Sequence, residues 1–335
     1  MKKDKIIIIA EAGVNHNGKL SLAKKLVSEA AKSGADYIKF QTFETESMVK
    51  PSTRLANYQK SNLKGNLSQF DMLKKYELKK KDYKILIKFA KNKNIKFISS
   101  PFDINSINFL KKFNLDFIKI PSGEINNFPY LRAIGKLKRK VILSTGMSTL
   151  GEISYALKIL RTYGTKKNKI TLLHCHSDYP SRSEDLNLKA IITLQKYFKI
   201  NVGYSDHSKG IIAPLISIAM GARIIEKHLT LSTKMIGPDH KASINPTEFK
   251  EMVNYIRETE KMLGNGKKIP SKHELKNKPI VRKSLFAKID IKKGERFSEK
   301  NLTTKRPEIG LSPSKYLYML NRISKKNYKK NNPIK

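Results

Sequence analysis

The chain repeats one pattern, a short apolar run rich in β-branched residues followed by a stretch in which apolar positions have helical spacing. The helical stretches include 20–32, 104–113 and 150–163. This alternation predicts parallel strands joined by crossover helices. Eight such units over about the first 265 residues predict a closed (β/α)8 barrel, the TIM-barrel architecture. The predicted strands are 6–10, 37–41, 96–99, 117–120, 141–144, 170–174, 201–204 and 223–226.

Polar side chains follow the predicted strands at the points where the strands end. The carboxyl ends of barrel strands converge on one face, and a buried polar group is costly unless something pairs with it. The ring of polar groups therefore predicts a ligand site, although strand ends also become polar simply where they reach water. Its main members are Glu11, Lys39, Gln41, Ser100, Lys119, Ser122, Glu124, Ser177, Tyr179, Ser205, His207, Glu226 and His228.

Two histidines stand just past two consecutive predicted strands. His207 follows the strand at 201–204, and His228 follows the strand at 223–226. Two neutral imidazoles suit a divalent transition metal and leave coordination positions for water and substrate. The alternative is that each histidine is a hydrogen-bonded structural residue.

Two lysines emerge directly from apolar strands, unlike the many lysines on predicted helices. Lys39 follows Ile38, and Lys119 follows Ile118, so both side chains are expected to point inward. The turn at 121–124 can offer backbone N–H groups and the Ser122 hydroxyl to a phosphate. These groups predict an anion site; the alternative is that the lysines extend to solvent.

Composition excludes several classes of protein. The net charge of +40 invites a nucleic-acid partner, but the lysines are scattered over the predicted helices and form no stripe, so a solvated surface is expected and no nucleic-acid site. A positive field would still steer a small anionic substrate. One cysteine excludes a disulfide framework, and the sequence has neither a long apolar span nor a leader, so a cytoplasmic protein without membrane contact is expected.

The composition changes after residue 265. A polar segment at 266–281 is predicted to be a linker, and 282–335 reads as a small second domain of short strands and turns. Within the first domain, the long connection 42–95 is expected to form a lid or specificity element.

The motifs together resemble the sialic acid synthase family over essentially the whole chain. They are AEAGVNHNG at 10–18, KFQT at 39–42, SPFD at 100–103, KIPSGE at 119–124, STGM at 144–147, YSDH at 204–207, EKH at 226–228 and GPDH at 237–240. The resemblance implies a (β/α)8 barrel at 1–265 and a C-terminal antifreeze-like (SAF, β-clip) domain at 282–335. It also implies a metal-dependent condensation of phosphoenolpyruvate (PEP) with N-acetylmannosamine, which yields a nine-carbon 2-keto sugar acid and phosphate.

The resemblance also assigns residues. It implies Mn²⁺ on His207 and His228, with Mg²⁺ or Co²⁺ as alternatives. It implies PEP contacts from Lys39, Ser100, Lys119, Ser122, Ser177 and Ser205. It implies sugar contacts from Glu11, Gln41, Asn66, Tyr179, Asp239 and Arg306. Glu124 is the first candidate for proton transfer beside Lys119, and Glu11 is the second.

Two alternatives follow from the same residues. Within the family, a legionaminic acid synthase would use 2,4-diacetamido-2,4,6-trideoxymannose in place of N-acetylmannosamine. From a different class, a non-catalytic barrel would bind an anionic glycan or a nucleic acid through its charge. The resemblance further implies a domain-swapped homodimer in which Arg306 reaches the partner's sugar site.

Overall fold

The structure is a computed structural model that describes residues 5–63 and 67–335. The chain divides into two compact units, Met1–Gly264 and Asn265–Lys335. In the first unit, eight parallel strands form a barrel in the order β3-β2-β1-β8-β7-β6-β5-β4, and β3 also packs against β4. The predicted barrel is confirmed, and each predicted strand is present. The strands are β1 (Ile7–Gly13), β2 (Tyr37–Thr42), β3 (Lys96–Pro101), β4 (Ile118–Ile120), β5 (Val141–Ser144), β6 (Ile170–Cys175), β7 (Asn201–Asp206) and β8 (Ile224–His228).

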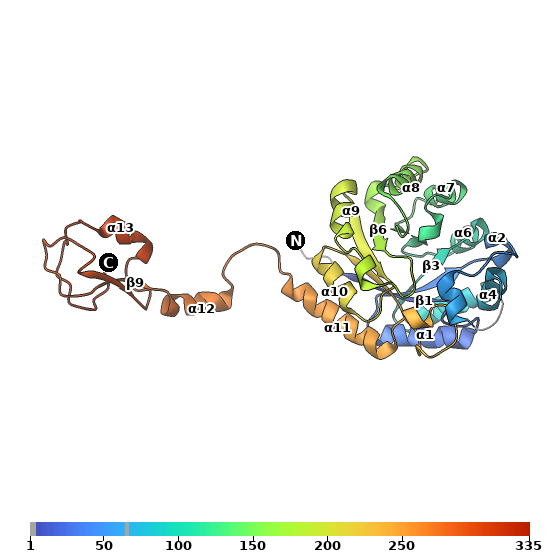
Figure 1. The fold of residues 1–335 in the computed structure, drawn as a ribbon, viewed down its shortest axis with the longest axis horizontal. Coiled ribbons are helices and arrows are strands. Elements are labelled where there is room, and N and C mark those ends of the chain that lie inside the picture. Colours follow the sequence, from blue (N-terminus) through green and yellow to red (C-terminus); the bar gives the residue numbers. More distant parts are fainter. Residues whose placement is uncertain (1–4, 64–66) are drawn as a thin grey trace. The chain divides into compact units, whose positions relative to one another are not determined.

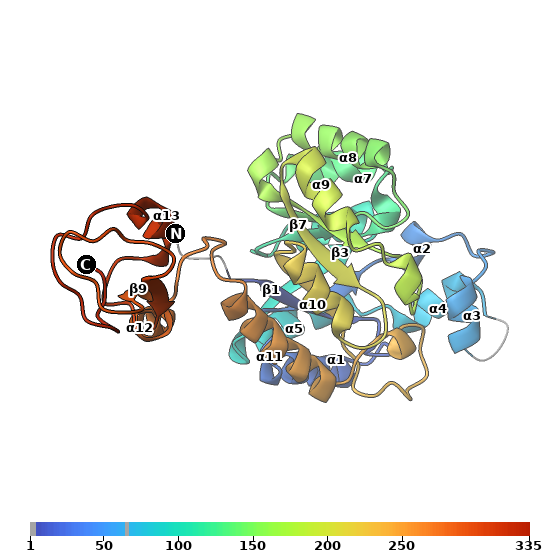
Figure 2. The ribbon, with the colours of Figure 1, turned by 60° about the vertical axis from the view of Figure 1, so that its left-hand side comes forward.

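Helices surround the strands (Figure 1). They are α1 (Leu20–Lys32), α5 (Lys80–Asn92), α6 (Ile104–Leu110), α7 (Phe128–Lys136), α8 (Leu150–Thr162), α9 (Ala190–Phe198), α10 (Ile212–Ala219) and α11 (Pro246–Met262). Helix α1 shows why they pack as they do: its buried residues Ala23, Leu26, Val27 and Ala30 recur every three or four positions and form one apolar face. Figure 2 shows α1 beside α11, which closes the helical layer.

The long connection between β2 and β3 contains three further short helices before α5. These are α2 (Thr45–Met48), α3 (Asn57–Asn62) and α4 (Gln69–Tyr76), which Figure 2 shows together at one end of the barrel. Their apolar residues, including Met72, Leu73 and Tyr76, form a small cluster of their own with Val14 and Phe43.

The barrel interior has an apolar layer with a polar layer above it. Side chains in a strand alternate between its two faces, so residues two apart share the interior. The interior pairs are Ile9 and Glu11, Tyr37 and Lys39, Ile98 and Ser100, Phe117 and Lys119, Ile142 and Ser144, and Ile224 and Glu226. Gly203 of β7 contributes no side chain to the lower layer, and its neighbours fill that space. A Cβ at this position would lie 2.6 Å from Leu173 Cδ2 and 2.8 Å from Ile224 Cβ. The filled lower layer makes the barrel a cup that opens at the carboxyl ends.

The second unit is a small domain around one antiparallel pair, β9 (Ser284–Ala287) and β10 (Leu302–Lys305). Its core includes Leu285, Phe297 and Tyr328. It also contains α13 (Tyr316–Met319) and α12 (Lys272–Val281), and α12 lies within the segment predicted to be a linker. No helix in residues 5–63 or 67–335 is long and apolar enough to cross a membrane.

Candidate active site

A cavity of about 370 Å³ opens at the carboxyl ends of the barrel strands. It brings together most of the predicted site residues, although they are spread over more than 200 positions of the sequence. Those that line it are Glu11, Lys39, Gln41, Ser100, Lys119, Ser122, Ser177, Tyr179, Ser205, His207, His228 and Asp239. Convergent polar groups in a closed barrel mouth are the arrangement of a small-molecule site.

Four of the lining side chains, Glu11, Lys39, Lys119 and Glu226, form a buried charged cluster. One oxygen of Glu226, Oε1, lies 3.0 Å from Lys119 Nζ, 3.3 Å from Lys39 Nζ and 3.1 Å from Ser205 Oγ. Lys39 also pairs with Glu11 at 3.1 Å and donates to Ser100 Oγ at 3.2 Å. Glu226 therefore holds three predicted PEP contacts in one place, a role that the sequence alone did not assign.

The charges of this cluster depend on one another. Burial alone would raise the pKa of Glu226, but the ammonium groups of Lys119 and Lys39 outweigh burial and hold that pKa below its ordinary value. Burial also lowers the pKa of Lys119, whereas Glu11 and Glu226 raise the pKa of Lys39 against the same penalty. An ammonium pair held by a carboxylate is preorganised for an anion with two negatively charged ends.

The predicted sugar contacts Glu11, Gln41 and Asp239 surround Gly13. A Cβ at Gly13 would lie 3.3 Å from Asp239 Oδ2 and 3.4 Å from both Gln41 Nε2 and Glu11 Oε1. Gly13 also has a φ of +50°, which favours glycine. Burial raises the pKa of Asp239 to about 7, and burial likewise raises the pKa of Glu11. Asp239 can therefore carry a proton near neutral pH on this side of the cavity, beside Glu11, whose pKa is raised in the same direction.

The two histidines suit a divalent metal. His207 Nδ1 lies 2.6 Å from the carbonyl oxygen of His176, so Nδ1 carries the proton and Nε2 keeps its lone pair. His228 Nδ1 is buried without a hydrogen-bond partner among the described residues, and the two ring centroids are 5.5 Å apart. Burial lowers the pKa of His207 to about 4 and that of His228 well below its ordinary value, so both rings are neutral.

No group of three or more His, Cys, Asp or Glu side chains suited to a metal occurs in residues 5–63 and 67–335. A metal on these two histidines would therefore complete its coordination with water and substrate oxygens.

Aromatic rings border the histidines. The Tyr179 ring lies 4.1 Å from the His207 ring and 4.9 Å from the ring of Tyr58 in α3, centroid to centroid. Asn62, at the end of α3, donates to the carbonyl oxygen of Pro238 at 2.8 Å. The long connection therefore reaches over the cavity and touches the loop that carries Asp239, as a specificity element would.

Ser122, in the turn after β4, and Ser177, after β6, lie close to Gly146. Its N–H donates to Ser122 Oγ at 3.0 Å, and a Cβ at this glycine would lie 2.1 Å from Ser177 Oγ. Ser122 Oγ is also 3.3 Å from Cys175 Sγ. The absence of a side chain at Gly146 thus leaves room for two predicted PEP contacts beside it.

Three predicted residues are not among those that line the cavity. Glu124 lines a neighbouring cavity and accepts a hydrogen bond from Asn127 at 2.6 Å. Arg306 belongs to the second unit. Asn66 lies outside the described residues. The proposed proton role of Glu124 stays a prediction, and Glu11 is the carboxylate that contacts Lys39.

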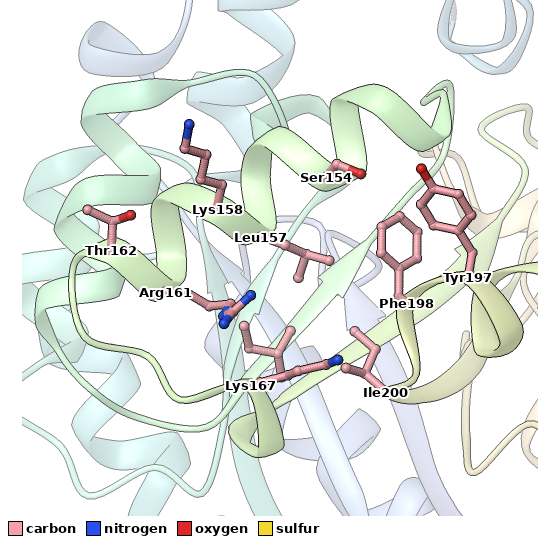
Figure 3. Close-up of a pocket in the computed structure, with 10 residues that line it drawn as sticks. Ser154, Leu157, Lys158, Arg161, Thr162, Lys167, Tyr197, Phe198 and Ile200 are labelled. Carbon is pink, nitrogen blue, oxygen red and sulfur yellow. The ribbon is translucent and has the colours of Figure 1, made fainter.

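A second cavity, of about 540 Å³, lies on the outside of the barrel between α8 and α9 (Figure 3). Arg161 and Lys167 extend toward it, and Tyr197 stands at its edge. None of the residues that line it is a predicted site residue, so this cavity is not part of the candidate site.

Comparisons with known proteins cover both units. The NeuB family model matches residues 26–268, and the SAF domain model matches residues 282–335. An N,N′-diacetyllegionaminic acid synthase of Campylobacter jejuni is 52% identical over 99% of each chain. A synthase of the same name from Legionella pneumophila is 45% identical over 92% of this chain and 87% of its own length. The crystal structure of an N-acetylneuraminic acid synthetase from Leptospira borgpetersenii, in complex with citrate, has a TM-score of 0.72 and 36% identity, with 82% of this chain and 90% of that chain covered.

Proposed function

Since the chain belongs to the NeuB family, a family of PEP-condensing nonulosonic acid synthases, we propose that it makes N,N′-diacetyllegionaminic acid from PEP and 2,4-diacetamido-2,4,6-trideoxymannose. The two relatives of that name, at 52% and 45% identity, support this sugar. They favour the alternative of the sequence analysis over its first choice, N-acetylmannosamine. The buried cluster of Lys39, Lys119 and Glu226 beside two neutral histidines is the observation that carries the chemistry.

The cavity wall supports the choice of sugar. Met48, Met72 and Leu73, all from the long connection, line the cavity together with Val14, which belongs to the same apolar cluster. The trideoxy sugar has a methyl group at C6 and a second acetamido methyl, where N-acetylmannosamine has two hydroxyls. An apolar wall favours methyl groups by roughly 1–3 kcal/mol each, whereas it leaves a hydroxyl without a hydrogen-bond partner.

In the proposed reaction, the chain's own residues would bind PEP and transfer protons. Lys39 and Lys119 would hold the phosphate and carboxylate of PEP, with help from Ser100 and Ser205. PEP C3 then forms a bond to the aldehyde carbon of the open-chain sugar, water adds at C2, and the C2–O bond breaks to release phosphate. The metal of the family, if held by His207 and His228, would supply Lewis acidity toward a carbonyl oxygen. Glu11 and Asp239 can each hold or release a proton beside the sugar.

Phosphate release with each sugar tests the proposal. We expect kcat/KM at least tenfold higher with 2,4-diacetamido-2,4,6-trideoxymannose than with N-acetylmannosamine, both with saturating PEP and Mn²⁺. The reverse order would restore N-acetylneuraminate synthesis as the function. No phosphate release with either sugar would favour a non-catalytic barrel.

A substitution in the wall separates sugar choice from folding. Met72→Gln places an amide in the wall and should lower the preference for the trideoxy sugar. Tyr76→Phe is the control, since Tyr76 belongs to the same apolar cluster but is not among the residues that line the cavity. If the ratio of kcat/KM for the two sugars is the same in both variants and in the unchanged protein, the apolar wall does not determine the choice of sugar.

A further inference from the structure

A buried ion pair lies on the other side of the strands that carry the two histidines. Lys227 and Asp206 are both 0% exposed, and Lys227 Nζ lies 2.5 Å from Asp206 Oδ2. They face each other in the ladder between β7 and β8. Neither lines the cavity, because each alternates with cavity residues along its strand.

Asp206 also fixes the chain on both sides of His207. Its Oδ1 accepts from Tyr204 Oη at 3.0 Å, from Ser208 N at 3.0 Å and from Ser208 Oγ at 2.7 Å. Lys227 donates in turn to the carbonyl oxygen of Ser208. The carboxylate of Asp206, the residue before His207, therefore holds Ser208, the residue after it, and also Lys227, the residue before His228.

We propose that the ion pair of Lys227 and Asp206 positions His207 and His228 for the divalent metal, an inference that rests on the metal site of the proposed function. Lys227 and Asp206 are positioning residues, because they act on the metal only through the backbone of the two histidines. A rigid link between the strand ends fixes the spacing of the imidazoles before a metal arrives.

The energetics of burial favour this reading over one of stability alone. A fully buried ion pair loses its hydration, and apolar residues of similar size often stabilise a fold as well or better. Unlike apolar residues, the ion pair forms hydrogen bonds that have a fixed direction. Groups that orient metal ligands from behind typically change metal affinity 10- to 100-fold when they are removed.

Metal titration tests the proposal in three variants of the full chain. Asp206→Asn keeps an oxygen for Ser208 but removes the charge, and Asp206→Asn with Lys227→Met removes the pair without leaving a buried charge. Arg257→Met is the control, because Arg257 pairs with Asp36 and with the carbonyl oxygen of Ile6 near the start of β1, at the other end of the barrel. The chelator-treated proteins are titrated with Mn²⁺, and free Mn²⁺ is measured by electron paramagnetic resonance while thermal unfolding is followed separately.

We expect the double variant to bind Mn²⁺ at least tenfold more weakly, and Arg257→Met to bind it as the unchanged protein does even if its melting temperature falls. A folded double variant with unchanged Mn²⁺ affinity overturns the proposal. An equal loss of affinity in Arg257→Met also overturns it, since affinity would then follow general stability. If the double variant does not fold, Asp206→Asn alone decides the question by the same criterion. An unchanged protein that binds no Mn²⁺ refutes the metal site itself.

Discussion

Replacement of Lys119 by methionine should specifically damage the use of PEP. The side chain is only 3% exposed and lies 3.0 Å from Glu226, so its ammonium is desolvated and aimed at the predicted anion position. Methionine keeps most of the volume but removes the charge. Loss of one member of a buried, hydrogen-bonded charge pair costs about 2–5 kcal/mol. At about 1.4 kcal/mol per factor of ten, kcat/KM for PEP should fall by about 30- to 4,000-fold.

Steady-state phosphate release at varied PEP and fixed sugar measures this effect, with KM for the sugar determined alongside. Lys96→Met is the matched control, because Lys96 has a 65% exposed side chain and pairs with Asp116 at 2.6 Å on the barrel surface. A surface pair contributes at most about 1 kcal/mol, so PEP kinetics should not change in this variant. A value of kcat/KM within threefold of the unchanged enzyme in Lys119→Met would refute the anion site.

Three further outcomes are expected. Chelation should abolish turnover and Mn²⁺ should restore it, but not in His207→Ala or His228→Ala; full activity in excess chelator would contradict the metal assignment. Burial lowers the pKa of His16 to about 4, so its neutral form stabilises the fold fully above about pH 6.5 and this contribution is lost as the pH falls toward 4. The His16→Gln variant should therefore lose less unfolding free energy between about pH 6.5 and pH 4 than the unchanged protein, by roughly 3 kcal/mol in urea titrations at these two pH values. Equal losses in the two proteins would refute this expectation. Mixed dimers of Arg306→Ala and Lys119→Met chains, formed at random, should recover about a quarter of full activity if Arg306 serves the partner's site, and no recovery in a verified mixed dimer would exclude that arrangement.

The sequence could predict the interior layers of the barrel because they depend on local order. Side chains along a strand alternate between its two faces, so Ile9 and Glu11 lie on one face, as do Ile224 and Glu226. Each segment of the sequence shows this alternation without reference to the others. Eight repetitions then imply closure, and closure implies that all polar strand ends meet. Neither step depends on which strand faces which across the barrel.

Partnerships across the barrel could not be predicted in that way. Glu226 pairs with Lys119 from the distant strand β4, and the distance of 3.0 Å follows only from the closed geometry. Lys227 follows the charged Glu226, whereas Lys39 and Lys119 each follow an isoleucine, so nothing in the sequence predicts the full burial of Lys227. The sequence favours Glu124 for proton transfer because it lies near Lys119 in the chain, whereas the turn after β4 places it at a neighbouring cavity.

The placement of acids in a strongly basic chain explains how the mouth can select its anion. With 68 Lys and Arg against 28 Asp and Glu, the whole surface attracts anions, and this raises their encounter rate without distinguishing among them. The mouth, however, contains Glu11, Glu226 and Asp239, each at most 7% exposed. The ionised carboxylate of Glu226 offsets part of the charge of Lys39 and Lys119, so a simple anion that reaches the mouth meets repulsion along with attraction. A ligand gains from entry only if it pairs with both ammonium groups and also leaves each carboxyl group with a partner. PEP together with an amino sugar meets this requirement better than free phosphate does.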